Sequence, residues 1–379
     1  MEKVKLGDIY SISSGGTPSR KNLEYYSGGT INWVKTGDLK KKYIEETEER
    51  ITDKGLYNSS TKIYNPGTVL IAMYGATIGE TSILNIKACT NQACAAFIKN
   101  NKVIPEYLYY FFKSNKEKFV NAGIGGAQPN ISIGYLKNVL FNLYEISEQE
   151  KIVDKLNKLE EIIDLRKKQI EELDELIKSK FVDMFGDISK NSKNYKIVNL
   201  SDISQYWNGL TYKPSDINEI GTIVLRSSNI QNGKLDYKDL IRVSCVIPEK
   251  KYVKNNDILM CSRNGSARLV GKVALINNSN EDMSFGAFMM IIRSEYYPYL
   301  MTFFQMDSFR AQISTSATTT INQITSNMMN NVKLPLPSMD EINKFAKIVE
   351  QIDKQKFMLE KSLKETEELQ ESLMNKYFN

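Results

Sequence analysis

An internal repeat constrains the fold of this chain more than any other feature. The stretch VKLGDIYSISSGGT (4–17) returns as VNLSDISQYWNGLT (198–211), with Val, Leu, Asp, Ile, Gly and Thr at matching places. Three further pairs follow in the same order: INWVKTGDL with TIVLRSSNI, TVLIAMYGATIG with DILMCSRNGSARLVG, and NISIGYLKNVLFNL with QITSNMMNNVKLPL. The offset stays at roughly 193 residues, which indicates a duplicated structural unit. A chain of 379 residues can form two such units, each with its own core.

Each half begins with a globular part that mixes strands and helices. Short apolar runs such as GTVLIAMYG and AFMMIIR, bounded by Gly, Asn, Lys or Ser, predict strands. Residues 104–123 and 296–314 are typical of helices. We therefore expect an α+β fold in which residues 1–146 and 187–338 form two β-rich mixed globular domains.

Each globular part is followed by a long amphipathic segment, at 147–186 and 339–379. Apolar residues alternate by three and four along both segments, which predicts a coiled-coil seam interrupted at Arg166 and Lys356. Asp340 is positioned to cap the second helix, and Gly186 to end the first. The predicted seam consists of Ile152, Leu156, Leu159, Ile163, Ile170, Leu173, Phe345, Val349, Ile352, Leu359, Leu363 and Leu373.

Two arrangements can bury these stripes. Each helix can pack on its own domain, or the two helices can pack on each other. The first helix leads into the second globular part, and the second leads back toward the start of the chain. If both halves keep the same internal arrangement, a two-fold axis relates them and the helices form an antiparallel coiled coil.

The composition excludes several classes of protein. The chain contains no histidine, which removes Ser-His-Asp and Cys-His catalysis and the HExxH metalloproteases. The four cysteines form no CxxC pair, so we expect reduced thiols and no metal site. We find no catalytic motif and expect a non-catalytic protein. The start has no run typical of a signal peptide and no stretch long enough to span a membrane, which favours the cytoplasm.

The charge is unevenly distributed along the chain. The net charge is +5, but the two long amphipathic segments are acidic, so the excess of basic residues lies in the globular parts. This distribution suits domains that face a polyanion while the helices are held away from it.

Polar and basic residues cluster at corresponding turns of the two halves, with different side chains in each. Arginine can read guanine, Asn and Gln can read adenine, and Ser, Thr, Lys and Gly backbone suit phosphates. A repeat that keeps its frame while these loops differ fits one scaffold that reads two sequences in double-stranded DNA. The candidate DNA-binding residues are Thr17, Ser19, Arg20, Lys35, Thr36, Asp38, Tyr74, Thr77, Gln128 and Asn130 in the first half, and Trp207, Lys213, Arg226, Ser228, Asn229, Arg263, Asn264, Ser266, Arg268, Thr318, Thr320 and Asn322 in the second.

The whole chain resembles the specificity subunits of type I restriction-modification systems. The segments that carry this resemblance are KLGDIYSISSGGTPS, INWVKTGDL, MYGATIG and GAQPNISIGYLKNV leading into ISEQEKIVDKLNKLEEII. The second half keeps this frame more loosely, with VLRSSNI and SATTTINQI at two of these places.

The resemblance implies two target recognition domains, each reading one half of a bipartite DNA site. It implies a coiled coil that sets the spacer and docks two modification (methyltransferase) subunits, with restriction subunits as further partners. S-adenosylmethionine, ATP and magnesium would then be cofactors of the partner subunits and not of this chain. The alternatives are the recognition subunit of a type IIB-like restriction-modification enzyme, a coiled-coil adaptor that does not bind DNA, and a self-contained enzyme. The target bases and the spacer length do not follow from the sequence.

Overall fold

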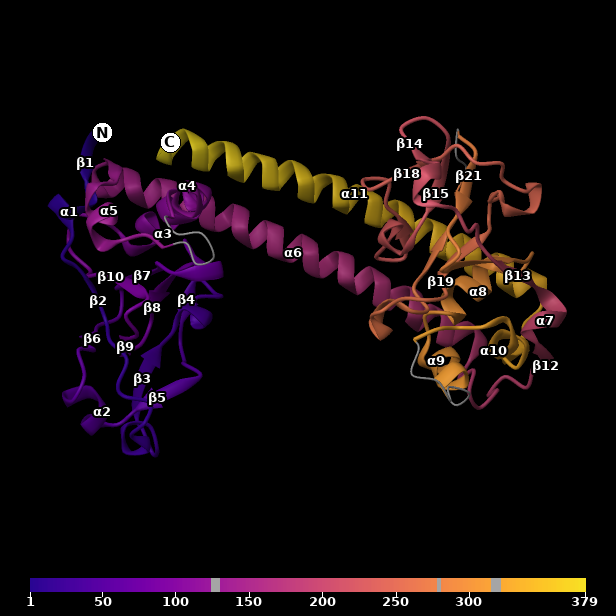
Figure 1. Ribbon diagram of the computed structural model, residues 1–379, viewed down its shortest axis with the longest axis horizontal. Coiled ribbons are helices and arrows are strands. Elements are labelled where there is room, and N and C mark those ends of the chain that lie inside the picture. The colour runs from indigo at the N-terminus through magenta and orange to yellow at the C-terminus, as the bar shows by residue number, and fades with distance from the viewer. Residues whose placement is uncertain (124–129, 278–280, 315–321) are drawn as a thin grey trace. The chain divides into compact units, whose positions relative to one another are not determined.

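The computed structural model describes residues 1–123, 130–277, 281–314 and 322–379. The chain divides into two compact units (Figure 1). Unit 1 contains Met1–Lys168 together with Glu360–Asn379, and unit 2 contains Gln169–Leu359. Each unit therefore combines one globular part with segments of both long helices.

Unit 1 is built on a five-stranded sheet in the order β2-β10-β7-β8-β4 and a four-stranded sheet in the order β5-β3-β9-β6. A separate antiparallel pair, β1-β11, joins the start of the unit to the strand that precedes the first long helix. The strands are β1 (Glu2–Lys5), β2 (Ile12–Ser14), β3 (Ile31–Val34), β4 (Tyr43–Ile44), β5 (Glu49–Ile51), β6 (Ile63–Tyr64), β7 (Val69–Ala72), β8 (Thr81–Leu84), β9 (Ala88–Thr90), β10 (Cys94–Phe97) and β11 (Leu140–Leu143), and the shorter helices are α1 (Leu6–Ile9), α2 (Asp53–Tyr57), α3 (Pro105–Ser114), α4 (Lys116–Ala122) and α5 (Ile133–Asn138).

Unit 2 repeats this topology. The order β13-β22-β19-β20 corresponds to β2-β10-β7-β8, and the parallel pair β15-β21 corresponds to β3-β9. The pair β12-β23 matches β1-β11, so the sequence repeat is also a structural repeat. The strands are β12 (Lys196–Asn199), β13 (Gln205–Asn208), β14 (Ile217–Asn218), β15 (Thr222–Leu225), β16 (Ile230–Gln231), β17 (Lys234–Leu235), β18 (Ile241–Val243), β19 (Ile258–Cys261), β20 (Val273–Leu275), β21 (Met283–Phe285), β22 (Met289–Arg293) and β23 (Lys333–Leu336), and the shorter helices are α7 (Leu200–Ile203), α8 (Tyr297–Phe303), α9 (Asp307–Ser314) and α10 (Ser326–Asn330).

The core of unit 1 forms where a helix covers a fully buried strand. All four residues of β7 and of β10 are buried, as continuous apolar runs of this length predict. The residues Tyr107–Phe112 of α3 are buried beside them. The helix predicted over 104–123 is in fact two helices that break at Asn115, whose side-chain amide donates to the carbonyl of Phe111 and so competes with the helical backbone. The counterpart in unit 2 is likewise divided into α8 and α9.

Two long helices, α6 (Ile146–Phe185) and α11 (Met339–Phe378), pack against each other within unit 1. Ile152 and Leu156, near the start of α6, share one buried cluster with Met374 and Phe378, near the end of α11. Arg166 donates to the carbonyl of Ser362, at 2.7 Å, and to the hydroxyl of Thr366. The start of one helix meets the end of the other, so the pairing within unit 1 is antiparallel.

The helices are also antiparallel within unit 2, where the end of α6 meets the start of α11. The rings of Phe181 and Phe185 lie 5.5 and 5.3 Å from the ring of Phe345. Lys356 is only 3% exposed, and its ammonium donates to Asp174 Oδ2 at 2.6 Å. The predicted interruption at Lys356 is therefore a buried lysine at a seam position. All twelve predicted seam residues are buried or half-buried, which agrees with the predicted coiled coil.

The ends of the helices agree only in part with the sequence analysis. Gly186 ends α6 with φ +76° and donates to the carbonyl of Val182, as predicted. The predicted cap at Asp340 is wrong, because Ser338 occupies that role. The backbone of Ser338 donates to the Glu341 carboxylate at 3.0 Å, and the backbone of Glu341 donates to the Ser338 hydroxyl at 3.4 Å, which is a reciprocal capping box.

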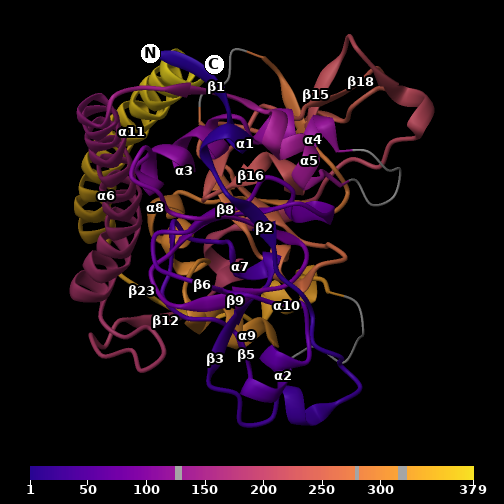
Figure 2. The ribbon, with the colours of Figure 1, turned by 90° about the vertical axis from the view of Figure 1, so that its left-hand side faces the viewer.

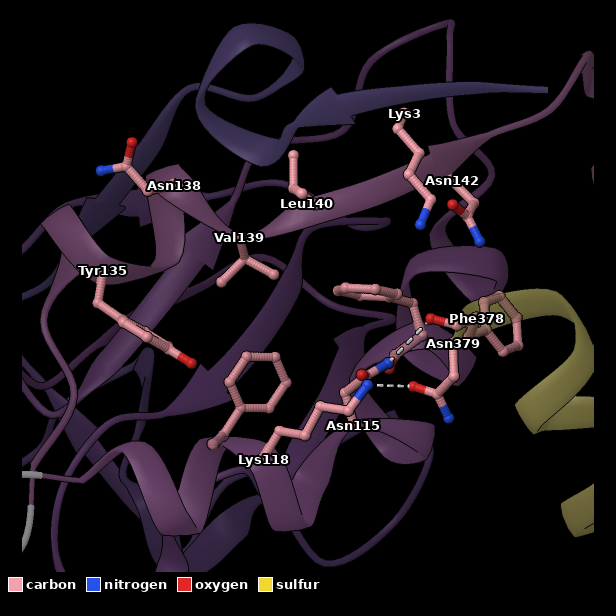
Figure 3. Close-up of a pocket in the computed structure, with 12 residues that line it drawn as sticks. Lys3, Asn115, Lys118, Tyr135, Asn138, Val139, Leu140, Asn142, Phe378 and Asn379 are labelled. Atoms are coloured by element: carbon pink, nitrogen blue, oxygen red, sulfur yellow. Dashed lines mark hydrogen bonds between the residues drawn. The ribbon is translucent and has the colours of Figure 1, made fainter.

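The C-terminal end of α11 is fixed inside unit 1, where Figure 2 shows the two chain termini at the same end of the unit. The side-chain amide of Asn142 donates to the carbonyl of Tyr377 at 3.0 Å, and that of Asn115 donates to the carbonyl of Phe378 at 3.5 Å. Asn115, Asn142 and Phe378 line a cavity of about 370 Å³ together with Lys118, which donates to the side chain of Asn379 (Figure 3). At this cavity, side-chain amides of unit 1 therefore satisfy the last carbonyl groups of α11.

Candidate nucleic-acid interface

Three turns of unit 1 are held together by backbone hydrogen bonds at the end of β7. Met73 donates to the carbonyl of Ala93 at 2.8 Å, and Ile131 donates to the carbonyl of Met73 at 3.0 Å. Tyr74 and Asn130 form an antiparallel bridge between the first and third of these turns. Tyr74, Ala93 and Asn130 thereby lie close together although they come from distant parts of the sequence.

Unit 2 contains the same backbone frame at the end of β19. Ser262 donates to the carbonyl of Phe288 at 2.9 Å, and Ile324 donates to the carbonyl of Ser262 at 2.7 Å. Arg263 and Gln323 form the bridge that corresponds to Tyr74 and Asn130. The frame is thus conserved between the units, while the side chains that it presents differ.

A carboxylate bridges two cations in unit 1. Glu49 accepts from Arg20 Nη1 at 2.6 Å and from Lys35 Nζ at 2.6 Å. The guanidinium of Arg20 lies over the rings of Tyr26 and Trp33, with its Cζ 4.5 and 5.0 Å from their centroids. The hydrogen bonds from Arg20 and Lys35 hold the pKa of Glu49 below its ordinary value, and the hydrogen bond to Glu49 raises the pKa of both cations.

The other predicted residues in the first part of unit 1 are either exposed or bonded to neutral groups. Thr17 donates to the side-chain oxygen of Gln92, and Ser19 is exposed. Asp38 accepts from the backbone of Lys35 at 2.7 Å, so its carboxylate shapes the 3₁₀ turn that also contains Thr36.

The turn after β7 presents one large exposed side chain. Tyr74 is 43% exposed, whereas the hydroxyl of Thr77 donates to the Tyr74 carbonyl at 3.1 Å. Asn130 is exposed, and Gln128 lies outside the described residues.

The loop after β19 is the most basic part of the unit 2 frame. Arg263, Ser266 and Arg268 are exposed. Neither arginine forms an ion pair with any residue that the structure describes. The Cζ atom of Arg263 lies 5.5 Å from the ring centroid of Phe288, which is itself 60% exposed. This loop therefore offers two uncompensated guanidinium groups and one aromatic face.

Side-chain amides fix the shape of this loop. Asn264 donates to the hydroxyl of Ser227 at 3.1 Å and accepts from the backbone of Ser266 at 3.0 Å. Asn322 donates to the carbonyl of Gly265 at 3.2 Å and accepts from the backbone of Asn264 at 3.3 Å. The predicted residues Thr318 and Thr320 lie outside the described residues.

The segment after β15 contributes less to the surface than the sequence suggested. Asn229 is fully buried, and its amide bonds to the carbonyls of Asp236 and Asp239 and to the backbone of Arg226. A direct DNA contact is therefore not supported for Asn229. Arg226 forms an ion pair with Asp239 at 2.8 Å, and Ser228 is exposed.

The first predicted residues of unit 2 lie on β13 and in the loop after it. Trp207 is half-buried under the guanidinium of Arg293, whose Cζ lies 4.9 Å from the indole ring. Lys213 is exposed, and its backbone donates to Asp216 at 2.7 Å. Trp207 therefore helps to support the sheet, while Lys213 remains available at the surface.

The sequence analysis missed Glu49, Gln92, Asp239 and Phe288. Gln92 and Phe288 lie in the short turns that link β9 to β10 and β21 to β22, the same place in each repeat. Both turns lie between two apolar runs at equivalent positions of the repeat, and this pattern could have identified Gln92 and Phe288 from the sequence. Glu49 and Asp239 pair with cations across loops, and no local pattern predicts such pairs.

Within the described residues, no group of His, Cys, Asp and Glu side chains could hold a metal ion. No helix in the part of the chain that the structure describes is both long and apolar enough to cross a membrane.

The comparisons with known proteins agree on one family. The family described as "Type I restriction modification DNA specificity domain" matches residues 1–175 and 192–371. The MjaIX specificity subunit of Methanocaldococcus jannaschii is 35% identical over 47% of this chain, and the EcoR124I/EcoR124II specificity subunit of Escherichia coli is 26% identical over 45%. These matches span less than half of each relative, at 43% and 46% of its length. The MjaVIII specificity subunit of M. jannaschii is 22% identical over 99% of this chain and 91% of its own length.

Solved structures show the same fold. A structure that describes complex assembly and conformational transition of the type I R-M system matches with a TM-score of 0.64 and 18% identity, over 100% of this chain and 97% of the other. The type I S subunit from M. genitalium matches with a TM-score of 0.57 and 15% identity, over 100% and 96%. With the family match over both repeats, the chain belongs to the type I restriction modification DNA specificity family.

Proposed function

We propose that this chain is the DNA specificity subunit of a type I restriction-modification complex. The observation that carries the proposal is the repeated frame of three turns, which presents Tyr74 and Asn130 in unit 1 but Arg263 and Gln323 in unit 2. One backbone geometry with two sets of polar side chains suits the reading of two different half-sites. Residues 1–146 and 187–338 would act as the two target recognition domains, and 147–186 and 339–379 as the helices that set the spacer.

The chain would recognise the target sequence and position the partner subunits, but it would contribute no catalytic group. Adenine methylation, with S-adenosylmethionine as donor, would belong to two modification subunits. ATP- and magnesium-dependent cleavage would belong to restriction subunits where these are present. The complex would act in the cytoplasm, where it meets double-stranded DNA.

Exposed apolar side chains on the long helices support the docking of two identical partners. In unit 1, Leu165 of α6 is 53% exposed and Leu369 of α11 is 51% exposed. Their repeat equivalents in unit 2 are Met358, which is 63% exposed, and Leu176, which is 39% exposed. Exposed large apolar residues that recur in both copies favour a repeated protein contact. We assign this contact to the modification subunits.

Methylation mapping tests the proposal. The chain is expressed with its modification subunit in a host without other adenine methylation, and the modified adenines are located by sequencing. We expect one bipartite motif with a fixed spacer. Methylation by the modification subunit alone at the same motif, or the absence of any motif, would contradict the proposal.

A second arm of this experiment tests the docking surface. Leu165→Glu and Met358→Glu should each weaken the binding of one modification subunit, and the double variant should abolish the complex, as measured by native mass spectrometry. Val246→Glu, at a 95% exposed apolar position of unit 2 that belongs to neither long helix, is the matched control and should leave assembly unchanged.

A further inference from the structure

Phe288 is an exposed aromatic residue that the proposed function has not yet used. It is 60% exposed although it lies between two buried strands, β21 and β22. Its carbonyl accepts from the backbone of Ser262 at 2.9 Å and of Arg263 at 3.0 Å. The ring is therefore held at the surface by the same hydrogen bonds that form the unit 2 frame.

The ring of Phe288 lies within cation–π distance of Arg263. The guanidinium carbon is 5.5 Å from the ring centroid, inside the range in which an aromatic ring attracts a cation. Three other arginines of unit 2 have acidic partners: Arg226 pairs with Asp239, Arg242 with Glu281 and Arg293 with Asp257. Among the described residues, the ring is the only charge-stabilising neighbour of Arg263 and leaves its hydrogen-bond donors unoccupied.

The loop that carries Arg263 is fixed before any ligand arrives. Asn264, Asn322 and the bridge to Gln323 hold its backbone on both sides. A side chain on a fixed loop loses less conformational freedom on binding than one on a loose loop. Arg263 and Phe288 thus form a preorganised pair, with one planar donor group and one apolar face next to each other.

We propose that Arg263 and Phe288 act as one reading element, and that the half-site read by unit 2 contains a guanine beside a thymine. A guanidinium can donate two hydrogen bonds to guanine O6 and N7, and an apolar side chain can contact the thymine methyl group. Phe288 is then a specificity-determining residue for thymine and a positioning residue for Arg263. This inference rests on the proposed function, because it requires that unit 2 reads DNA.

The experiment uses the complex with the modification subunit and measures binding to oligonucleotides that carry the mapped motif. Replacing the thymine by deoxyuridine removes only the methyl group, and should weaken binding of the unaltered complex about fourfold. With Phe288→Ala, the same replacement should have no effect. Changing the guanine should weaken binding about five- to 150-fold for the unaltered complex, and Arg263→Ala should abolish that difference.

Two further variants separate the role of the ring from the role of apolar bulk. Phe288→Tyr keeps the ring under Arg263 and should keep full discrimination of guanine. Phe288→Leu keeps an apolar contact to the methyl group but loses the ring, and should lower guanine discrimination about two- to fivefold. Because Phe288 is largely exposed, these variants should unfold at the temperature of the unaltered chain.

The outcomes distinguish this inference from the proposed function. If no bipartite motif is mapped, the proposed function fails. If a motif is mapped but the half-site that depends on Arg263 contains no guanine beside a thymine, the inference is overturned while the function stands. The same holds if Phe288→Ala leaves the deoxyuridine effect unchanged.

Discussion

The two units share one backbone frame but differ in the side chains that this frame presents. In unit 1, Arg20 and Lys35 both pair with Glu49, Lys35 also lies 3.8 Å from Glu48, and the frame itself presents Tyr74. In unit 2, the frame presents Arg263 and Arg268 without an acidic partner among the described residues. The hydrogen bonds that build the frame join backbone atoms, so they are preserved whatever side chains the frame carries. This difference teaches that recognition can diverge inside a duplicated fold without loss of the scaffold.

The largest expected effect is a loss of stability when the buried aromatic residue at the end of either long helix is removed. Phe185 ends α6 in the core of unit 2, and Phe378 ends α11 in the core of unit 1. Phe185 in unit 2 and Phe378 in unit 1 are repeat equivalents, 1% and 4% exposed. Replacing either by Ala should lower the free energy of unfolding by about 3–5 kcal/mol, because a large buried ring leaves a cavity. Hydrogen exchange should show that Phe185→Ala loosens unit 2 and Phe378→Ala loosens unit 1. Equal loss of protection in both units would contradict the division of the molecule into two cores.

Substitution in the frame should affect one half-site only. Arg263→Ala should cost about 1–3 kcal/mol of discrimination at the unit 2 half-site, because a bidentate contact is lost. Tyr74→Ala is the matched variant in unit 1 and should alter the other half-site. Methylation sequencing of both variants checks this result. A uniform loss at both half-sites would show that these residues contribute only to general DNA affinity.

Removing the carboxylate that bridges Arg20 and Lys35 should give unit 1 an unpaired cation, as unit 2 has among its described residues at Arg263 and Arg268. Glu49→Gln removes the carboxylate that Arg20 and Lys35 share, so Arg20 loses its acidic partner and Lys35 keeps only Glu48, at 3.8 Å. We expect the slope of log affinity against log salt to steepen by about 1–2. Asp239→Asn, which frees only Arg226, should steepen it by about 1. An unchanged slope in both variants would place these cations outside the DNA interface.

Acid pH should weaken the ion pairs that Glu49 forms with Arg20 and Lys35. Because Glu49 has a lowered pKa in the folded chain, its ion pairs contribute stability above its unfolded pKa and lose it as the pH falls through the folded value. The stability of Glu49→Gln should therefore depend less on pH than that of the unaltered chain below about pH 4.5. Urea unfolding between pH 3 and pH 7 measures this difference. Parallel pH profiles for the two chains would show that Glu49 is not ion-paired.

The smallest effect is expected at the buried lysine of the unit 2 seam. Lys356→Met replaces a buried ammonium with an apolar side chain of similar length, while the partner Asp174 is 48% exposed and can return to water. We expect the free energy of unfolding to change by less than about 1 kcal/mol, in either direction. Lys356→Ala, which leaves a gap in the seam, is the control that should destabilise the chain more. A large loss in the Met variant would mean that the ion pair itself stabilises unit 2.

The sequence predicted the parts of the fold that depend on local, repeated patterns. The apolar residues from Ile152 to Leu173 are spaced by three and four positions, which is the pattern of a coiled-coil seam. The second long segment repeats this pattern and so supports the same prediction. The cap of α11 was misplaced at Asp340, although Ser338 and Glu341 carry the capping-box spacing in the sequence itself. The break of the α3–α4 region at Asn115 depends on a side-chain bond that competes with the helix.

The candidate site was predictable as a set of turns but not as a set of contacts. Arg263 and Tyr74 were predicted because polar residues follow apolar runs at equivalent places, and the structure puts both in the corresponding backbone bridges. The burial of Asn229 could not be predicted, because its amide is enclosed by a loop that closes only in three dimensions. Phe288 was missed because an aromatic residue beside an apolar strand is normally a core residue, and only the folded structure shows that its ring is exposed.

The central claim is that one frame, built twice, reads two half-sites through the side chains that it presents. A transplant tests it most directly: Tyr74→Arg with Ala93→Phe places the side chains of Arg263 and Phe288 at the equivalent positions of unit 1. Methylation mapping of this double variant should show a changed half-site for unit 1, with the unit 2 half-site and the spacer unchanged. A variant that still methylates the original motif, or one in which the unit 2 half-site changes instead, would contradict the account.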